Sequence, residues 1–232
     1  MTQLLASVRN LPEAEIALSV GVDIVDLKEP ANGALGAVDL PVIKQVAQRA
    51  AGHRPISATI GDLPMNPELI RSAVCERFNE GADYVKMGVF PGGDIAGTLL
   101  AIKSEAGRGH GLVAVFFADL EPDLSLLSGL SAAGFAGVML DTAAKQSGTL
   151  LDHASEPMLS DFVQEAHRLG MVCGLAGSLR RDDIFRLLSL GPDYLGFRGA
   201  LCREGRSSAI DAGLVRQISA MIKDAERVPA ER

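Results

Sequence analysis

The sequence predicts one domain built as a closed barrel of eight alternating β-strands and α-helices. Short β-branched runs alternate with helix-length amphipathic segments about eight times along the chain. Glycine stands just past a helix and directly before an apolar strand in three segments, 79–83, 132–137 and 189–193. The 232 residues are 47% apolar and show no shift in composition, so we expect a single domain over residues 1–232, with a frayed tail after about residue 226.

The first four strands are apolar runs that end at a charge or a turn. They are expected at 4–8, 23–28, 55–61 and 83–89. A proline or an aspartate opens each following helix, since both residues suit a first helical turn. These helices are expected from Pro12, from 39–41, near Pro67 and near Asp94.

The last four strands repeat the same pattern. They are expected at 111–119, 136–143, 171–178 and 193–201. Their helices are expected after Pro122 and over about 156–169, 182–190 and 211–226. An open, doubly wound parallel sheet is the alternative for such alternation. No GxGxxG motif follows the first strand, so the sequence does not support the dinucleotide site typical of that fold, and we favour the closed barrel.

Composition excludes several classes of function. The net charge of -7 and the absence of Lys and Arg clusters interleaved with aromatic residues argue against a nucleic-acid partner. The sequence has neither a leader-like start nor 18 uninterrupted apolar residues, so we expect a cytoplasmic protein with no membrane partner.

The cysteines and histidines give no sign of a metal site. Cys75, Cys173 and Cys202 form no CxxC pair and are expected to be reduced. The four histidines lack metal-binding spacing, so we expect no metal and no cofactor. A homo-oligomer stays open, because apolar positions such as Leu187 and Leu188 suit either a core or an interface.

Charged residues interrupt or end the apolar strands, which indicates an active site. In an α/β barrel the reactive groups lie at the C-terminal ends of the strands. Asp26 and Lys28 share one face at the end of the second strand, and Lys86 stands within DYVKMGV of the fourth. Asp141 ends the sixth strand, with Lys145 four residues later, while Asp119 ends the fifth.

Each of these residues also has a structural interpretation. Lys86 could be an interior lysine paired with Asp26 or Asp141. Asp141 could serve as a turn residue beside Thr142, and Lys145 could be a solvated loop lysine. If the lysines converge, they indicate imine chemistry on a carbonyl substrate, because burial and a neighbouring cation make a neutral amine available near pH 7.

Glycine-rich turns near the end of the chain predict a phosphate site. GLAGSL at 174–179 and GFRGAL at 196–201 follow the seventh and eighth strands, where such barrels commonly hold a phosphate. The expected ligands are Gly177, Ser178, Arg198 and Gly199. The same glycines would also suit tight turns. We place Asp26 with this substrate-binding group, as an orienting or charge-balancing residue.

Five motifs in this order resemble the (5-formylfuran-3-yl)methyl phosphate synthases of methanofuran biosynthesis. They are VDLKEP, YVKMGVF, MLDTAAK, GLAGSL and GFRGALC. The resemblance implies a TIM-barrel lyase that condenses two molecules of glyceraldehyde 3-phosphate, releasing phosphate and water. It also implies that Lys28 forms a Schiff base, that Lys86 accepts a proton, and that Asp141 and Lys145 assist proton transfer.

Two rival functions stay open at this point. A class I aldolase or a phosphosugar isomerase would share the imine lysine but leave phosphate on its product. A non-enzymatic regulator that binds a phosphorylated metabolite would use Lys28 and Lys86 only as charges.

Overall fold

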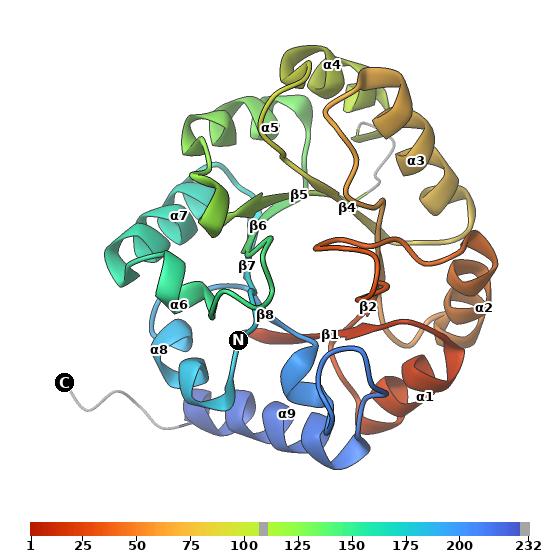
Figure 1. The fold of residues 1–232 in the computed structure, drawn as a ribbon, viewed down its shortest axis with the longest axis vertical. Helices are drawn as coiled ribbons and strands as arrows, with labels where there is room; N and C mark the ends of the chain where they lie inside the picture. Colours follow the sequence, from red (N-terminus) through yellow and green to blue (C-terminus); the bar gives the residue numbers. More distant parts are fainter. Residues whose placement is uncertain (107–110, 228–232) are drawn as a thin grey trace.

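Eight parallel strands close into a barrel in the computed structural model, which describes residues 1–106 and 111–227. The strands follow one another in chain order, and β1 pairs with β8 to complete the ring (Figure 1). Their bounds are β1 (Gln3–Val8), β2 (Ile24–Leu27), β3 (Ile56–Thr59), β4 (Tyr84–Gly88), β5 (Gly111–Phe117), β6 (Gly137–Asp141), β7 (Val172–Leu175) and β8 (Tyr194–Phe197). The predicted closed barrel is confirmed, and the open sheet is wrong because no strand edge is left between β8 and β1.

Helices surround the ring of strands, as Figure 1 shows. Their bounds are α1 (Leu11–Val20), α2 (Leu40–Ala50), α3 (Pro67–Asn79), α4 (Ile95–Ala106), α5 (Leu127–Ala133), α6 (Leu150–His153), α7 (Glu156–Arg168), α8 (Ile184–Leu188) and α9 (Ala212–Arg227). Most of the tail expected to fray, residues 228–232, lies outside the described residues. Within the described part of the chain, no helix is long and apolar enough to cross a membrane.

Helix ends follow from local sequence. Asn10 and Asn66 cap α1 and α3, because each side chain accepts a hydrogen bond from a backbone N–H three residues on, at 3.0 Å. The three glycines expected at helix-to-strand joints all have left-handed backbones, with φ of 98° at Gly81, 91° at Gly134 and 73° at Gly191. This recurring joint returns the chain to the sheet after each helix.

The strand expected at 171–178 is shorter than predicted. β7 ends at Leu175, and shortly after it Gly177 and Ser178 have φ of 115° and 49°. Positive φ is incompatible with a strand, so the backbone turns here and forms part of the cavity wall. The strand expected at 193–201 is shortened in the same way, since a 3-10 turn begins at Gly199.

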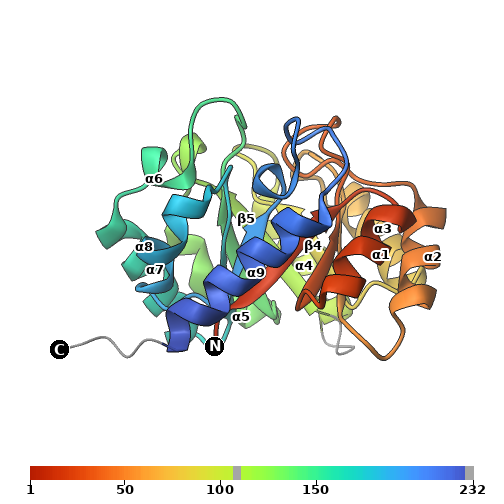
Figure 2. The same ribbon diagram turned by 90° about the horizontal axis from the view of Figure 1, so that it is seen from below.

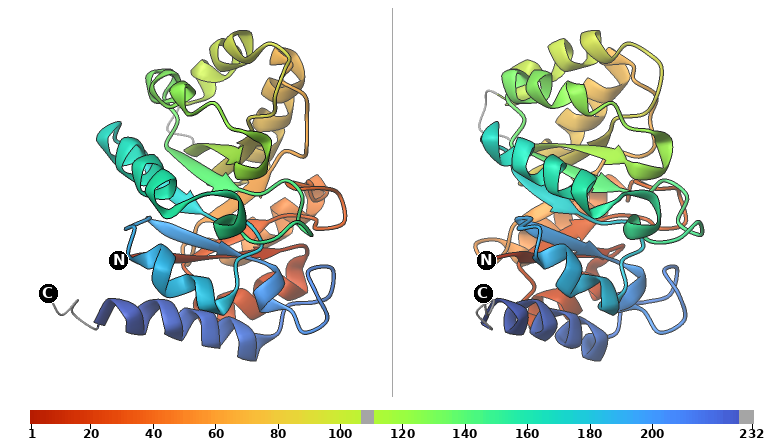
Figure 3. Two further views of the ribbon diagram at one scale, coloured as in Figure 1. Left: turned by 60° about the vertical axis from the view of Figure 1, so that its left-hand side comes forward. Right: turned by 90° about the vertical axis from the view of Figure 1, so that its left-hand side faces the viewer.

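The apolar core has two parts, and the charged residues of the strand ends lie on the C-terminal side of the inner part. A large cluster fills the layer between strands and helices, and it includes Leu187 of α8, which is fully buried. A smaller cluster that includes Leu5, Val113, Met139 and Tyr194 contributes to the core within the ring. The long loops after β2, β6 and β8 rise on one side of the barrel, and the N-terminus and the end of α9 lie toward the other side (Figures 2 and 3). That looped side is the C-terminal face, where the site forms.

Candidate active site

A cavity of about 780 Å³ opens at the C-terminal ends of the strands. Its wall includes Lys28, Lys86, Asp141 and Lys145, which sequence analysis placed at separate strand ends. The closed ring brings these side chains together, since β2, β4 and β6 point the same way around one axis. The cavity also includes the turns at 177–178 and 198–199. The structure therefore places these sequence-predicted candidates around one cavity, whereas Asp119 is not among the lining residues.

Lys86 forms a buried ion pair across the barrel interior. Its Nζ lies 2.6 Å from Oδ1 of Asp26, and the two side chains are 2% and 1% exposed. Burial lowers the pKa of Lys86, although Asp26 acts in the opposite direction, and the positive charge of Lys28 lowers the pKa further. Lys86 is therefore a cation that gives up its proton more readily than an ordinary lysine.

Asp26 is held from both sides. Ser7 at the end of β1 donates its hydroxyl to Oδ2 of Asp26 at 2.8 Å, while Oδ1 faces Lys86. With both oxygens engaged and no exposure to solvent, Asp26 balances the charge of Lys86. The expected charge-balancing role thus has a geometric basis, with Lys86 rather than Lys28 as the partner.

Asp141 lies between two lysines. Its Oδ2 is 3.4 Å from Nζ of Lys28, and its Oδ1 contacts Nζ of Lys145 and accepts the N–H of Thr142 at 2.7 Å. Burial would raise the pKa of Asp141, but the charges of Lys145 and Lys28 outweigh it and hold this pKa below its ordinary value. Asp141 is therefore an anion at neutral pH.

Lys145 is not a solvated loop lysine. Its side chain is only 8% exposed, and burial lowers its pKa to about 8 against the opposing effect of Asp141. An amine with a pKa close to neutrality can both give and take a proton under physiological conditions. Four residues of loop after β6 are enough to bring this amine back over the strand end.

Lys28 occupies the space between the two charged pairs. Its backbone N–H still donates to Val8 O at 2.9 Å, so the residue continues the ladder one position past β2. Its side chain is 8% exposed and reaches Asp141, and its charge acts on both Lys86 and Lys145. The amine of Lys28 therefore lies among Asp141, Lys86 and Lys145.

The turn after β7 has a shape that only glycine allows. A Cβ on Gly177 would meet Thr142 Cγ2 at 3.0 Å and the Thr142 backbone N at 3.2 Å, in a backbone with φ of 115°. Ser178 donates its hydroxyl to Lys145 O at 3.0 Å, which ties this turn to the loop that carries Lys145. The backbones of Gly177, Ser178 and Gly199 line the cavity.

Comparison with known proteins assigns the family. The family model for 4-HFC-P synthase matches residues 4–219. The chain belongs to the 4-HFC-P synthase family. It is 35% identical to the (5-formylfuran-3-yl)methyl phosphate synthase of Methanococcus maripaludis strain C5, over 95% of this chain and 99% of that protein. It is 34% identical to the protein of the same name from Methanocaldococcus jannaschii, over 95% and 99%. The resemblance seen in five motifs is confirmed.

Solved structures similar to this 4-HFC-P synthase family member share its fold. They include 3-hexulose-6-phosphate synthase from Salmonella typhimurium, with a TM-score of 0.66, 20% identity, and coverage of 97% of this chain and 100% of that one. Phosphoribosyl anthranilate isomerase from Thermotoga maritima has a TM-score of 0.69 at 12% identity, with coverage of 97% and 100%. Identities this low show the barrel and nothing finer.

Arg198 of the family member is engaged inside the protein. Its guanidinium donates to the carbonyls of Ser7, Arg206 and Ser208 at 3.1, 2.8 and 2.7 Å and contacts both carboxylate oxygens of Glu13. These contacts use the five N–H groups that a guanidinium has. The structure thus favours a structural role for Arg198, in place of the phosphate contact expected from the sequence.

Asp119 also has a structural task in this family member. Its carboxylate accepts the N–H groups of Ala143 and Ala144, each at 2.7 Å. These two bonds shape the start of the loop that returns Lys145 to the cavity. Among the described residues, no group of three or more His, Cys, Asp and Glu side chains is placed to hold a metal ion.

Sequence reasoning missed two residues that this family member places in the cavity wall, Ser7 and Arg206. Ser7 carried a usable signal, because it lies two residues after the inward-facing Leu5 and so shares its face. Arg206 carried none, because it stands in the polar segment REGRSS with no periodicity. Only the folded loop shows where its side chain goes.

Proposed function

We propose that this chain condenses two molecules of glyceraldehyde 3-phosphate into (5-formylfuran-3-yl)methyl phosphate through a Schiff base on Lys28, as a carbon–oxygen lyase of methanofuran biosynthesis. One observation carries the proposal: the buried amine of Lys28 lies 3.4 Å from a carboxylate shared with Lys145, in a cavity that also holds Lys86. The names of the relatives support the product.

The first step would form the imine. The neutral amine of Lys28 attacks the triose aldehyde, Lys86 gives its proton to the hydroxyl of the carbinolamine, and loss of one water leaves an iminium. The iminium then acidifies the C–H next to it.

The following steps would move protons and release phosphate. Lys86, whose pKa is lowered by burial, accepts the C2 proton once it has transferred its own proton away, and the imine becomes an enamine. One triose loses phosphate by β-elimination and the other keeps it. Carbon–carbon bond formation, ring closure and dehydration then give the furan, with one phosphate and two waters released per pair of trioses.

Protonated Lys145 would supply protons to leaving oxygens. At neutral pH it is mostly protonated, because its pKa is about 8, and Asp141 holds it in place. Backbone N–H groups of Gly177, Ser178 and Gly199 would bind the phosphate of the triose on Lys28, since glycine lets the backbone approach the oxygens. Aromatisation makes the final steps effectively irreversible.

A product assay tests the function. Incubation with glyceraldehyde 3-phosphate is expected to release one inorganic phosphate per two trioses consumed and to produce furan absorbance in the near ultraviolet, with a product mass equal to two trioses minus one phosphoric acid and two waters. An aldolase or isomerase would leave every phosphate on carbon. A binding regulator would consume no triose, and either result would refute the synthase assignment.

The pH dependence tests the role of Lys145. If its protonated form is required, kcat/KM is lost as the pH rises through its pKa, so an alkaline limb is expected with a midpoint near pH 8. Lys145→Met is expected to reduce kcat/KM by about 10²- to 10⁴-fold and to abolish this limb. A limb that persists unchanged in Lys145→Met would contradict the assignment.

A further inference from the structure

The loop between β8 and α9 is built as a rigid segment over the cavity mouth. Its two ends are joined by the antiparallel bridge between Cys202 and Ile210, and Asp211 N–H donates to Leu201 O at 2.7 Å. Arg203 at the start of the loop also pairs with Asp211 at 2.7 Å. These contacts close the loop upon itself, so its shape does not depend on a ligand.

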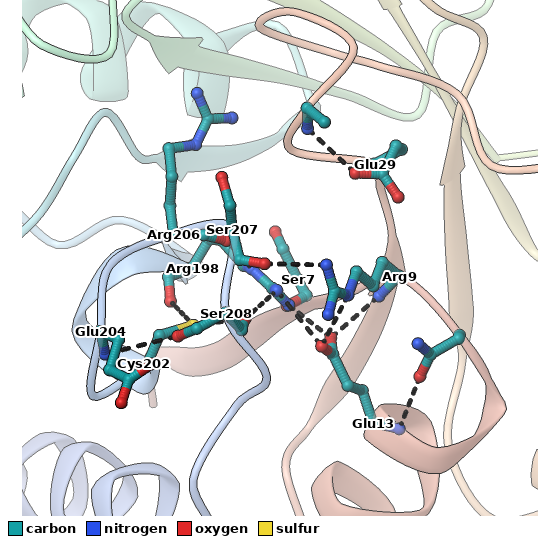
Figure 4. Close-up of polar contacts among 12 residues, drawn as sticks. Ser7, Arg9, Glu13, Glu29, Arg198, Cys202, Glu204, Arg206, Ser207 and Ser208 are labelled. Carbon is teal, nitrogen blue, oxygen red and sulfur yellow. Dashed lines mark hydrogen bonds and ion pairs between the residues drawn. The ribbon is translucent and has the colours of Figure 1, made fainter.

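Two arginines hold the middle of this loop from below. Arg198 donates to the carbonyls of Arg206 and Ser208, and Arg9 donates to the carbonyl of Ser207 at 2.8 Å. Glu13 contacts both arginines and is itself buried. Three successive carbonyls therefore accept hydrogen bonds from two arginines that share one buried carboxylate, as Figure 4 shows.

The side chain of Arg206 leaves this loop on the other side. Figure 4 shows its guanidinium extending away from the Glu13–Arg198 pair, and Arg206 lines the active-site cavity. The guanidinium donates to a carbonyl, Gly33 O, at 3.3 Å. The nearby carboxylate of Asp62 accepts from the backbone of Ala34 and Leu35, each at 2.7 Å.

The cavity has an excess of positive charge. The lining carboxylates are Asp26 and Asp141, whereas the lining cations are Lys28, Lys86, Lys145, Arg180, Arg181, Arg203 and Arg206. Arg198 also lines the cavity, but it is paired with Glu13. This local excess occurs in a chain whose net charge is -7. A half-buried guanidinium close to other cations is stabilised when an anion binds it.

The guanidinium of Arg206 reaches away from the Gly177–Ser178 turn, although the Arg206 backbone lies beside Gly199. It contacts the loop after β2, whereas the Gly177–Ser178 turn contacts the loop after β6. In a ring of eight strands in chain order, β2 and β6 stand on opposite sides. The guanidinium of Arg206 therefore points toward the β2 side of the mouth, while the Gly177–Ser178 turn lies on the β6 side.

We propose that Arg206 binds the phosphate of the second triose and orients that molecule toward the carbon activated on Lys28. This inference rests on the proposed function, which requires two phosphorylated molecules in one cavity. Arg198 and Glu13 are positioning residues in this arrangement, since they hold the backbone of the loop and need not touch substrate. A planar guanidinium can bind two phosphate oxygens at once, which fixes orientation as well as position.

Inorganic phosphate tests the site without any turnover. Calorimetric titration of the intact protein is expected to give two phosphates per chain, and Arg206→Gln is expected to retain one and to weaken the other by about tenfold to hundredfold. Arg216→Gln makes the same chemical change at an exposed position on α9, outside the cavity wall, and is expected to keep both phosphates. Unchanged binding in Arg206→Gln, or a single phosphate in the parent chain, would overturn the inference.

A trapping experiment separates the second site from the first. With glyceraldehyde 3-phosphate and borohydride, Arg206→Gln is expected to label Lys28 as the parent protein does, while kcat/KM for furan formation falls by at least about tenfold. Loss of labelling together with turnover would assign Arg206 to the first triose and overturn the proposal. If the parent protein forms no furan, the proposed function fails, and the titration still decides whether Arg206 binds phosphate.

Discussion

Lys28→Arg is expected to reduce furan formation on the order of 10⁴-fold or more, which is the scale seen when a catalytic nucleophile is removed. Arginine keeps the positive charge beside Asp141, 3.4 Å from the native amine, but its guanidinium cannot become a neutral nucleophile at physiological pH. Turnover is measured from phosphate release and product mass.

The fold of Lys28→Arg is expected to be intact, because the ion pairing with Asp141 survives. Circular dichroism and the midpoint of thermal unfolding check this point. Lys44→Arg makes the same chemical change at an exposed position on α2 and is expected to leave turnover at the parent level. Retained turnover in Lys28→Arg would refute the Schiff-base assignment.

Asp26→Asn is expected to lower the free energy of unfolding by about 3–5 kcal/mol at neutral pH, since it leaves the buried ammonium of Lys86 without its partner. The substitution preserves size and the contact with Ser7, so the effect isolates charge. Denaturant unfolding measures it. Turnover is expected to fall as well, because Lys86 loses the carboxylate that positions it.

The deficit in Asp26→Asn is expected to shrink as the pH rises. Burial lowers the folded-state pKa of Lys86, and removing Asp26 takes away an influence that raises it. Between that lowered pKa and the unfolded value of about 10.4, the unfolded chain binds more protons than the folded one, so stability increases with pH.

A double variant provides the control for the ion pair. Asp26→Asn with Lys86→Met removes both charges and is expected to be more stable than Asp26→Asn alone, because an apolar side chain of similar length can fill the interior without a charge. A double variant as unstable as the sum of the two single variants would contradict the pairing of these residues.

Much of the site was predictable because charges are conspicuous within apolar strands. Lys86 between Val85 and Met87, and Asp141 after Met139 and Leu140, lie where a barrel strand must be buried. The order of the strands then follows from the alternation of elements, and the barrel brings their ends together. Both interpretations of Lys86 are compatible with the structure, which pairs it with Asp26 inside the cavity.

The remainder depends on contacts between distant parts of the chain. Glu13 and Arg198 are 185 residues apart, and no local pattern relates them. Their pairing holds the guanidinium of Arg198 beneath the loop between β8 and α9. The same contacts fix the backbone from which Arg206 reaches the cavity. The expected roles of Ser178 and Arg198 rested on residue type alone, which cannot show that a donor is already used by a nearby carbonyl.

Borohydride reduction in the presence of glyceraldehyde 3-phosphate, followed by peptide mass mapping, tests the central claim most directly. The Schiff-base assignment predicts one covalent triose-derived mass on the peptide that contains Lys28, with the peptides of Lys86, Lys145 and Lys44 unmodified. Omission of borohydride controls for adducts that need no imine. An unmodified Lys28 peptide under conditions that support turnover, or a mass on Lys86 instead, would contradict the assignment.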